Sequence, residues 1–244
     1  MTFAIMKLIP GTILRLLASV ADIAAPRTCL LCDRALTMDE NAICLSCLAT
    51  LPRTFYHLDP NNSIALAMVH HRRMTRAACW LFYNHNSRVS DLIHSIKYHD
   101  MPDVGRVMGR MFADELKDAN FFDGVDALVP VPLHWLKRYR RHYNQSTVIA
   151  RGIAEVTGIP IADALVARAH SAQARLDGER RRKNVTPDTF SVRHPEMIDG
   201  KNIVIVDDVT TTGTTLNCIA AAILRDCPGV RRIDILTLGV ASDI

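Results

Sequence analysis

The stretch that decides the fold is residues 204–216, "VIVDDVTTTGTTL". Four of its first six positions carry branched apolar side chains, which predicts a strand buried in a core. The other two positions are the carboxylates Asp207 and Asp208, and a run of threonines around Gly213 comes after Val209. The sequence after the glycine begins a helical pattern. The stretch therefore predicts a strand, a short polar loop and a helix start.

Such a loop contains the components of a phosphate-binding site. Ligands of parallel sheets lie beyond the carboxyl ends of the strands, where the loop would offer N–H groups, hydroxyls and the positive end of a helix. Gly213 would let the backbone approach an anion, and because no lysine follows it the pattern is not a nucleotide P-loop. The carboxylates suit a sugar diol or Mg²⁺. The alternative is a solvated strand end followed by helix-capping threonines.

The chain around this stretch alternates between the two kinds of element. Apolar segments predict strands, and segments with helical spacing predict helices between them. The expected strands are 76–85, 126–134, 159–168, 201–209 and 231–240, and the expected helices are 90–99, 103–119, 144–158 and 214–227. Because the strands are apolar throughout, we expect an α/β fold whose parallel sheet is flanked by helices.

Four cysteines near the N-terminus form two close pairs, "CLLC" (29–32) and "CLSC" (44–47). Two turns of this kind can direct four thiolates at one Zn²⁺, with Cys29, Cys32, Cys44 and Cys47 as ligands. The alternatives are chance pairs or a redox motif, but redox pairs occur singly before a helix. A closed four-cysteine site is structural. We therefore predict a zinc module over 26–62 and the α/β domain over 63–244.

The first 25 residues are apolar but interrupted by charged residues, proline and glycine, so no run reaches the length of a membrane span. From residue 13 the apolar positions fall on one helical face. We expect an amphipathic helix over 1–25 that docks on the rest of the protein, with membrane-surface contact as the alternative.

The 7 cysteines, four of them in close pairs, do not suggest a secreted disulfide scaffold. The expected compartment is the cytoplasm.

Positive charge is concentrated in the middle of the chain. Residues 130–184 contain eleven Lys or Arg against four Asp or Glu, a net charge of +7 where the whole chain has +4. Arginine guanidinium groups can donate paired hydrogen bonds to phosphate oxygens, so the segment could face a pyrophosphate. Nucleic-acid phosphates and a plain solvated loop are the alternatives.

Residues 204–216 resemble the phosphoribosyl pyrophosphate (PRPP) motif of type I phosphoribosyltransferases. The resemblance implies that Asp207 and Asp208 hold the ribose hydroxyls. It also implies that the following loop holds the 5-phosphate, through Thr210, Thr211, Thr212, Gly213, Thr214 and Thr215. The segment "VPVPLH" (129–134) is similar to the pyrophosphate loop of amidophosphoribosyltransferases, which implies ligand contacts at Val131 and Pro132.

The order of motifs resembles the ComF family, which includes ComF and GntX-like proteins. Four cysteines come first, then "LIHSIKY" (92–98), "VPVPLH", an Arg-rich segment ending in "NQS" (144–146), an Arg-x-x-Asn pattern and the PRPP motif. The implied ligand contacts are Arg141, Asn144, Gln145 and Asn184, and Arg181 joins the two aspartates in catalysis from a loop that closes over the site. Where the family usually has Arg-Gly-Phe-Asn-Gln, this chain has His142 in place of the glycine.

Two classes of function follow from the resemblance. The first is a Mg²⁺-dependent enzyme that transfers the phosphoribosyl group of PRPP to an amine or a base nitrogen, by positioning and charge stabilisation. The second is a non-catalytic PRPP sensor or a module that handles single-stranded DNA in natural transformation, with a competence helicase as a partner. Lys97 matches the family's Lys-Tyr pair, but the spacing predicts only a surface lysine or one near a phosphate.

Overall fold

The computed structural model describes residues 26–40, 42–84, 87–98, 101–133, 142–167 and 186–241. Contacts divide the chain into two compact units, residues 1–51 and 52–244. The helix expected over 1–25 lies outside the described residues. Among the residues that are described, no helix has the length and apolar character to cross a membrane.

In the described residues of the first unit, two turns precede one short helix. The first turn begins at Cys29 and closes with a hydrogen bond from Asp33 N to Cys29 O of 2.9 Å. Helix α2 (Leu45–Ala49) contains Cys47 of the second pair, and its N-cap is Cys44, the other member. The carboxylate of Glu40, between the two pairs, accepts bonds from Thr37 N at 2.9 Å and Leu45 N at 2.7 Å. This carboxylate fastens the linking segment to the helix start.

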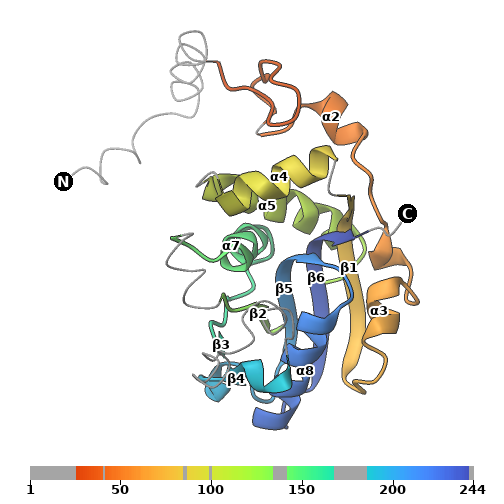
Figure 1. Cartoon of the computed structure of the whole chain (residues 1–244), viewed down its shortest axis with the longest axis vertical. Helices are drawn as coiled ribbons and strands as arrows, with labels where there is room; N and C mark the ends of the chain where they lie inside the picture. Colours follow the sequence, from red (N-terminus) through yellow and green to blue (C-terminus); the bar gives the residue numbers. More distant parts are fainter. Residues whose placement is uncertain are drawn as a thin grey trace, which may run out of the picture. The chain divides into compact units, whose positions relative to one another are not determined.

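A parallel sheet forms the centre of the second unit, in the order β1-β6-β5-β2. Its strands are β1 (Met74–Tyr83), β2 (Ala127–Pro130), β5 (Asn202–Thr210) and β6 (Arg232–Ala241). All three neighbouring pairs are parallel, as uniformly apolar strands predict. The carboxyl ends of the strands therefore meet at one edge of the sheet (Figure 1).

Helices cover both faces of this sheet. On one face, α8 (Thr214–Asp226) and α3 (Ser63–Ala67) share a buried cluster with the strands, which includes Ile64, Ile205 and Ile219. On the other lie α4 (Arg88–Tyr98), α5 (Pro102–Asp118) and α7 (Gln145–Thr157). There the Phe112 ring of α5 stacks on Trp80 of β1 with centroids 5.8 Å apart. The predicted parallel sheet flanked by helices is confirmed.

Helices α5 and α7 pack side by side at very short range (Figure 1). A Cβ added at Gly109 would lie 2.4 Å from the Ile149 carbonyl oxygen, and one at Gly152 would lie 2.0 Å from that of Arg106. Neither position has room for a methyl group. The two glycines therefore set the distance between these helices.

The segment expected as a strand over 159–168 differs from that prediction. Leu128 N donates to Pro160 O at 2.9 Å and Ala162 N donates to Leu128 O at 2.8 Å, so it pairs beside β2 at one bridge. The chain then forms β3 (Leu165–Ala167), which pairs antiparallel with β4 (Phe190–Val192) in a separate sheet. Neither Pro160 nor Pro130 of β2 can donate a ladder hydrogen bond, which limits the pairing to this bridge. Short 3₁₀ turns η5 (Pro187–Thr189) and η6 (Pro195–Met197) flank β4.

Residues 52–62 pack with the second unit. Thr54 N donates to Trp80 O at 3.0 Å, and Asn62 Nδ2 donates to Ala77 O at 2.9 Å. The 3₁₀ turn η2 (Tyr56–Leu58) lies between these two anchors. By contacts the units therefore divide at Leu51, earlier than the boundary expected at residue 62.

Candidate functional site

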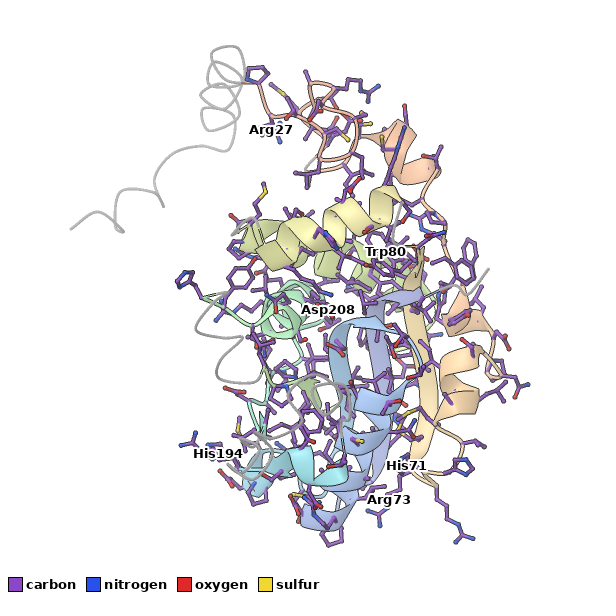
Figure 2. The ribbon with its side chains drawn as sticks, in the orientation of Figure 1. Arg27, His71, Arg73, Trp80, His194 and Asp208 are labelled. Atoms are coloured by element: carbon purple, nitrogen blue, oxygen red, sulfur yellow. The ribbon has the colours of Figure 1, made fainter. Side chains whose placement is uncertain are left out.

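The register of the sheet brings the two aspartates to its open edge. Strand β2 ends at Pro130, which pairs with Val206, so β5 continues past its neighbour from Asp207 onward. The N-terminal end of α7 lies beside Asp207, where Ser146 Oγ donates to Asp207 Oδ1 at 3.0 Å. Figure 2 labels Asp208 at this carboxyl end and Arg73 at the opposite end of the sheet. The site thus lies where the topology of a parallel sheet predicts it.

Asp207 is buried, and its surroundings disfavour its charge. Burial, together with the negative charge of Asp208, raises the pKa of Asp207 to about 7. Hydrogen bonds from Asp208 N and Ser146, and the charge of Lys97, act in the opposite direction. At neutral pH the carboxyl group is therefore close to the midpoint of its titration. An incoming cation or hydrogen-bond donor would favour its ionised form.

A pH-dependent stability follows from this raised pKa. The folded protein holds the Asp207 proton more tightly than the unfolded chain, so stability falls as pH rises from about 4 to about 7 and is then constant for this group. Asp207→Asn removes the titration and keeps an acceptor for Ser146. We expect the variant to gain about 1 kcal/mol or more at pH 8, or about 2–4 °C in melting temperature, and much less at pH 4.5. Thermal unfolding at both pH values would contradict this if the two shifts were equal.

Asp208 is held by an ion pair that the sequence did not predict. Lys97 Nζ, from the last turn of α4, lies 3.0 Å from Asp208 Oδ2. The Lys97 side chain is 19% exposed and that of Asp208 is 16% exposed, so the pair is largely shielded from water. Lys97 is therefore a member of the site rather than a surface residue.

The threonine loop opens onto solvent at the start of α8. Thr210 ends β5 and is buried, whereas Thr211, Thr212 and Thr214 are exposed and Thr215 is half-buried. Gly213 is the N-cap of α8 and supplies no capping side chain. The N–H groups of the first turn are therefore available to bind an anion at the positive end of a 13-residue helix. Thr212 Oγ1 and Thr214 Oγ1 lie 2.8 Å apart at the same place.

Asn217, which sequence reasoning missed, fixes the position of this loop. Its Nδ2 donates to Gly213 O at 3.2 Å and to Ala67 O at 3.0 Å, and its Oδ1 lies 3.1 Å from His71 Nε2. Because that amide oxygen can only accept, the Nε2 atom of His71 carries the proton. The backbone of Gly213 has a φ of 72°, which glycine adopts without strain. The only sequence signal for Asn217 was its place one helical turn after Gly213.

The start of α7 is tied to the loop after β2. Asn144 is the N-cap of α7, and its Nδ2 donates to Val131 O at 2.9 Å. Val131 and Gln145 are buried and Pro132 is half-buried. The structure thus brings Asn144 to the loop that holds Val131 and Pro132, and Gln145 begins the helix that also carries Ser146.

His142 keeps the backbone conformation that a glycine would adopt. Its φ is 60°, in the left-handed region that residues with a side chain rarely enter. A side chain at this position therefore comes at some cost in backbone strain. Next to it, the Tyr143 hydroxyl donates to the carbonyl of Ile96 and so joins this loop to α4.

Three predicted residues cannot be placed. Arg141, Arg181 and Asn184 lie outside the described residues. Their roles remain predictions.

The four N-terminal cysteines converge as predicted. The Sγ atoms of Cys29, Cys32, Cys44 and Cys47 all lie within 4.8 Å of one another. Cys32 Sγ and Cys44 Sγ are 3.8 Å apart, and thiolates about 2.3 Å from one tetrahedral metal are separated by about that distance. Cys44 N donates to Cys29 Sγ at 3.3 Å. Burial acts to raise the pKa of the Cys29 thiol, but backbone N–H groups outweigh it and lower that pKa to about 6. The cluster could hold a metal ion.

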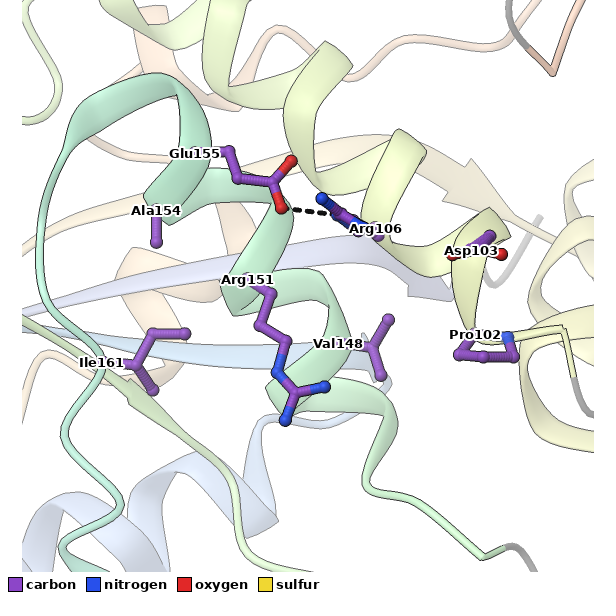
Figure 3. Close-up of a pocket in the computed structure, with 8 residues that line it drawn as sticks. All are labelled: Pro102, Asp103, Arg106, Val148, Arg151, Ala154, Glu155 and Ile161. Carbon is purple, nitrogen blue, oxygen red and sulfur yellow. Dashed lines mark hydrogen bonds and ion pairs between the residues drawn. The ribbon is translucent and has the colours of Figure 1, made fainter. Parts of the chain in front are cut away.

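A cavity of about 560 Å³ lies away from this edge, along α5 and α7. Its lining is Pro102, Asp103, Arg106, Val148, Arg151, Ala154, Glu155 and Ile161. Figure 3 shows Arg106 paired with Glu155 on one side, while Arg151 points away from that pair. Two arginines face two carboxylates, so the lining has no net charge to attract an anion. None of the predicted site residues lines it, and the strand ends remain the candidate site.

Comparison with known proteins gives the family. The model of the phosphoribosyl transferase domain matches residues 98–238, which include the aspartate pair, the threonine loop and the start of α7. The chain belongs to the phosphoribosyl transferase domain family. The matched range is more than half of the chain and begins just after Lys97.

Relatives of this phosphoribosyl transferase domain protein confirm the resemblance to the ComF family. Competence protein F of Haemophilus influenzae is 30% identical over 159 residues, which cover 63% of this chain and 68% of that protein. DNA utilization protein YhgH of Escherichia coli K12 is 29% identical over 203 residues, 81% of this chain and 84% of that protein. A solved glutamine PRPP amidotransferase from B. subtilis, complexed with ADP and GMP, aligns with a TM-score of 0.41 at 23% identity. That alignment covers 59% of this chain but only 30% of the enzyme.

Proposed function

We propose that the protein binds PRPP at the carboxyl edge of its sheet and transfers the phosphoribosyl group to an amine or base nitrogen. The observation that carries this proposal is the placement of Asp207 and Asp208 beside the uncapped start of α8. Acceptors for a sugar diol and donors for a phosphate then lie on adjacent residues of one strand–loop–helix unit. The family of the domain supports the same chemistry.

Each part of the site has a distinct role in this proposal. The two carboxylates accept hydrogen bonds from the ribose hydroxyls, and the N–H groups and hydroxyls of the threonine loop bind the 5-phosphate. The loop after β2 would face the pyrophosphate. Catalysis then consists of holding the ribose and its leaving group in place and stabilising the charge that develops on departure.

The carboxylate pair also fits a magnesium ion. Asp207 Oδ1 accepts bonds from Ser146 and Asp208 N, while its Oδ2 accepts no hydrogen bond from another described residue. Hard oxygen donors of this kind suit Mg²⁺. When bound with PRPP, the ion would neutralise the pyrophosphate and orient it for departure.

We propose zinc as the metal of the four-cysteine cluster. Four thiolates in a closed tetrahedral arrangement leave no position for a substrate, which is typical of structural zinc. The site would stabilise the first unit and take no part in the transfer.

Calorimetric titration of PRPP with and without Mg²⁺ tests the sugar-phosphate proposal. We expect Mg²⁺-dependent binding by the natural protein and a loss of about 100-fold or more in affinity when Asp207→Asn and Asp208→Asn are combined. Both substitutions keep the shape of the side chain and remove the charge that a bound ligand or metal would use, and Asp208→Asn also breaks the ion pair with Lys97. The matched control combines Asp114→Asn with Asp118→Asn, which removes the same charge from exposed positions of α5. This control should bind PRPP normally.

Two results would overturn the proposal. A folded, zinc-loaded protein that binds no PRPP at any Mg²⁺ concentration would exclude this ligand. Equal binding by the double variant would place the ligand elsewhere. If binding is observed, pyrophosphate release in the presence of candidate amines and bases would separate an enzyme from a PRPP sensor.

A second candidate is single-stranded DNA binding, favoured by relatives that carry the names Competence protein F and DNA utilization protein. The net charge of +7 over residues 130–184 suits a phosphate backbone. Binding to an oligonucleotide should then weaken steeply as salt rises. Affinity that is independent of salt would contradict this candidate.

A further inference from the structure

The ion pair between Lys97 and Asp208 occupies a carboxylate that the proposed function assigns to the ligand. Lys97 Nζ and Asp208 Oδ2 are 3.0 Å apart in a position largely shielded from water. In the absence of a ligand, Asp208 therefore already has a cationic partner. A divalent cation can bind this carboxylate only in competition with the ammonium group.

The fold holds Lys97 in this position. The preceding residue, Ile96, is buried, and the Tyr143 hydroxyl donates to its carbonyl. A Cβ added at Gly105 of α5 would lie 3.3 Å from Cγ2 of Ile96, so the last turn of α4 packs tightly on its neighbour. Lys97 is thus delivered to Asp208 by packing and by a hydrogen bond from the loop that precedes α7.

We propose that Lys97 is the counter-ion of Asp208 and reserves this carboxylate for a cation that arrives together with a polyphosphate. A free divalent cation must displace the ammonium group and leave it without a partner. A metal–polyphosphate complex brings anionic oxygens that can accept the same ammonium group. Lys97 would therefore disfavour metal binding before the sugar phosphate and favour binding of the complex. The second half of this inference rests on the proposed function, and the first half does not.

Titration of the zinc-loaded full chain with Mn²⁺ alone tests the first half. Electron paramagnetic resonance of the free ion reports binding without any sugar phosphate. We expect weak binding by the natural protein and binding about tenfold tighter or more in Lys97→Met, because a positive charge next to the carboxylate is removed. Lys97→Arg, which keeps the charge, should remain within about threefold of the natural protein.

A matched control removes a lysine from the opposite end of β5, the strand that carries Asp208. Lys201 precedes β5, and its Nζ donates to Met197 O at 2.7 Å. Lys201→Met lowers the net charge equally and should leave Mn²⁺ binding unchanged. If Lys97→Met fails to fold, Lys97→Gln keeps a neutral donor for Asp208 and should still tighten Mn²⁺ binding. Unchanged Mn²⁺ affinity in a folded Lys97 variant, or an equal gain in Lys201→Met, would overturn the inference.

Titration with PRPP at a saturating Mg²⁺ concentration tests the second half. Lys97→Met should lose about tenfold or more in affinity, because the anionic oxygens of the metal–polyphosphate complex would lose the ammonium group that they accept. Lys97→Arg should restore binding. Equal affinities of the natural protein and Lys97→Met would refute this half. If the natural protein binds no PRPP under any condition, the proposed function and this half fail together, while the Mn²⁺ result stands.

Discussion

Removal of the metal from the four-cysteine cluster is expected to unfold residues 26–51 and to leave residues 52–244 folded. Among the described residues of the first unit, the buried apolar ones are Cys29, Ile43, Cys44, Cys47 and Leu51, so three of these five belong to the cysteine cluster itself. So small a core cannot offset the conformational entropy of the chain. Structural zinc in modules of this kind contributes about 10 kcal/mol or more of apparent stability.

Limited proteolysis after treatment with a strong chelator measures this effect. Cleavage should appear first within 26–51 and yield a resistant fragment that begins near residue 52. Cys44→Ser should show the same cleavage and lose the one zinc per chain that mass spectrometry of the natural protein should find. Cys218→Ala, at a buried position of α8 outside the cluster, should keep its zinc. A chelated chain that resists the protease over 26–51 would show that the metal is dispensable.

Gly152→Ala is expected to destabilise the second unit by about 3 kcal/mol or more. The added Cβ would lie 2.0 Å from the Arg106 carbonyl oxygen and 2.9 Å from the Arg110 nitrogen. Both contacts are with backbone atoms of α5, which cannot move aside as a side chain can. The helices must separate by more than an ångström, and α7 carries the serine that binds Asp207. PRPP binding should therefore weaken along with stability.

Urea denaturation of matched variants separates this clash from a general effect of replacing glycine in a helix. Gly109→Ala meets the Ile149 carbonyl oxygen at 2.4 Å and should be similarly harmful. Gly105→Ala is the control, because its Cβ would meet only methyl groups of Ile96 and Val148, at 3.3 and 3.4 Å. It should change stability by no more than about 1 kcal/mol, since alanine is the better helix former. If the urea midpoint of Gly152→Ala equals that of the natural protein, α5 and α7 are not packed this closely.

The sequence predicted the sheet, its covering helices and the converging cysteines, because these depend on local patterns. Apolar runs of strand length and helical spacing remain visible within windows of about 10 to 18 residues. The place of the aspartate pair at the edge of the sheet was equally predictable, because it follows from the topology of parallel strands. The strand expected over 159–168 was partly wrong, because an apolar segment does not reveal which neighbour it pairs with.

The contacts that complete the site could not be predicted in this way. Lys97 reaches Asp208 from a helix more than a hundred positions earlier in the sequence, and Asn217 joins Gly213 to the end of α3. Each of these residues also suits an ordinary exposed position. Their roles depend on tertiary packing, which a pattern along the sequence does not report. The pKa of Asp207 likewise reflects burial that only the assembled fold creates.

The left-handed backbone at His142 bears on how members of this family are recognised. A search that requires glycine at this point would pass over the chain, although its backbone here has the positive φ that glycine favours. His142 thus holds a torsion angle that glycine adopts most easily. A search for this motif by backbone geometry should therefore find more distant members of the family than a search by amino-acid sequence.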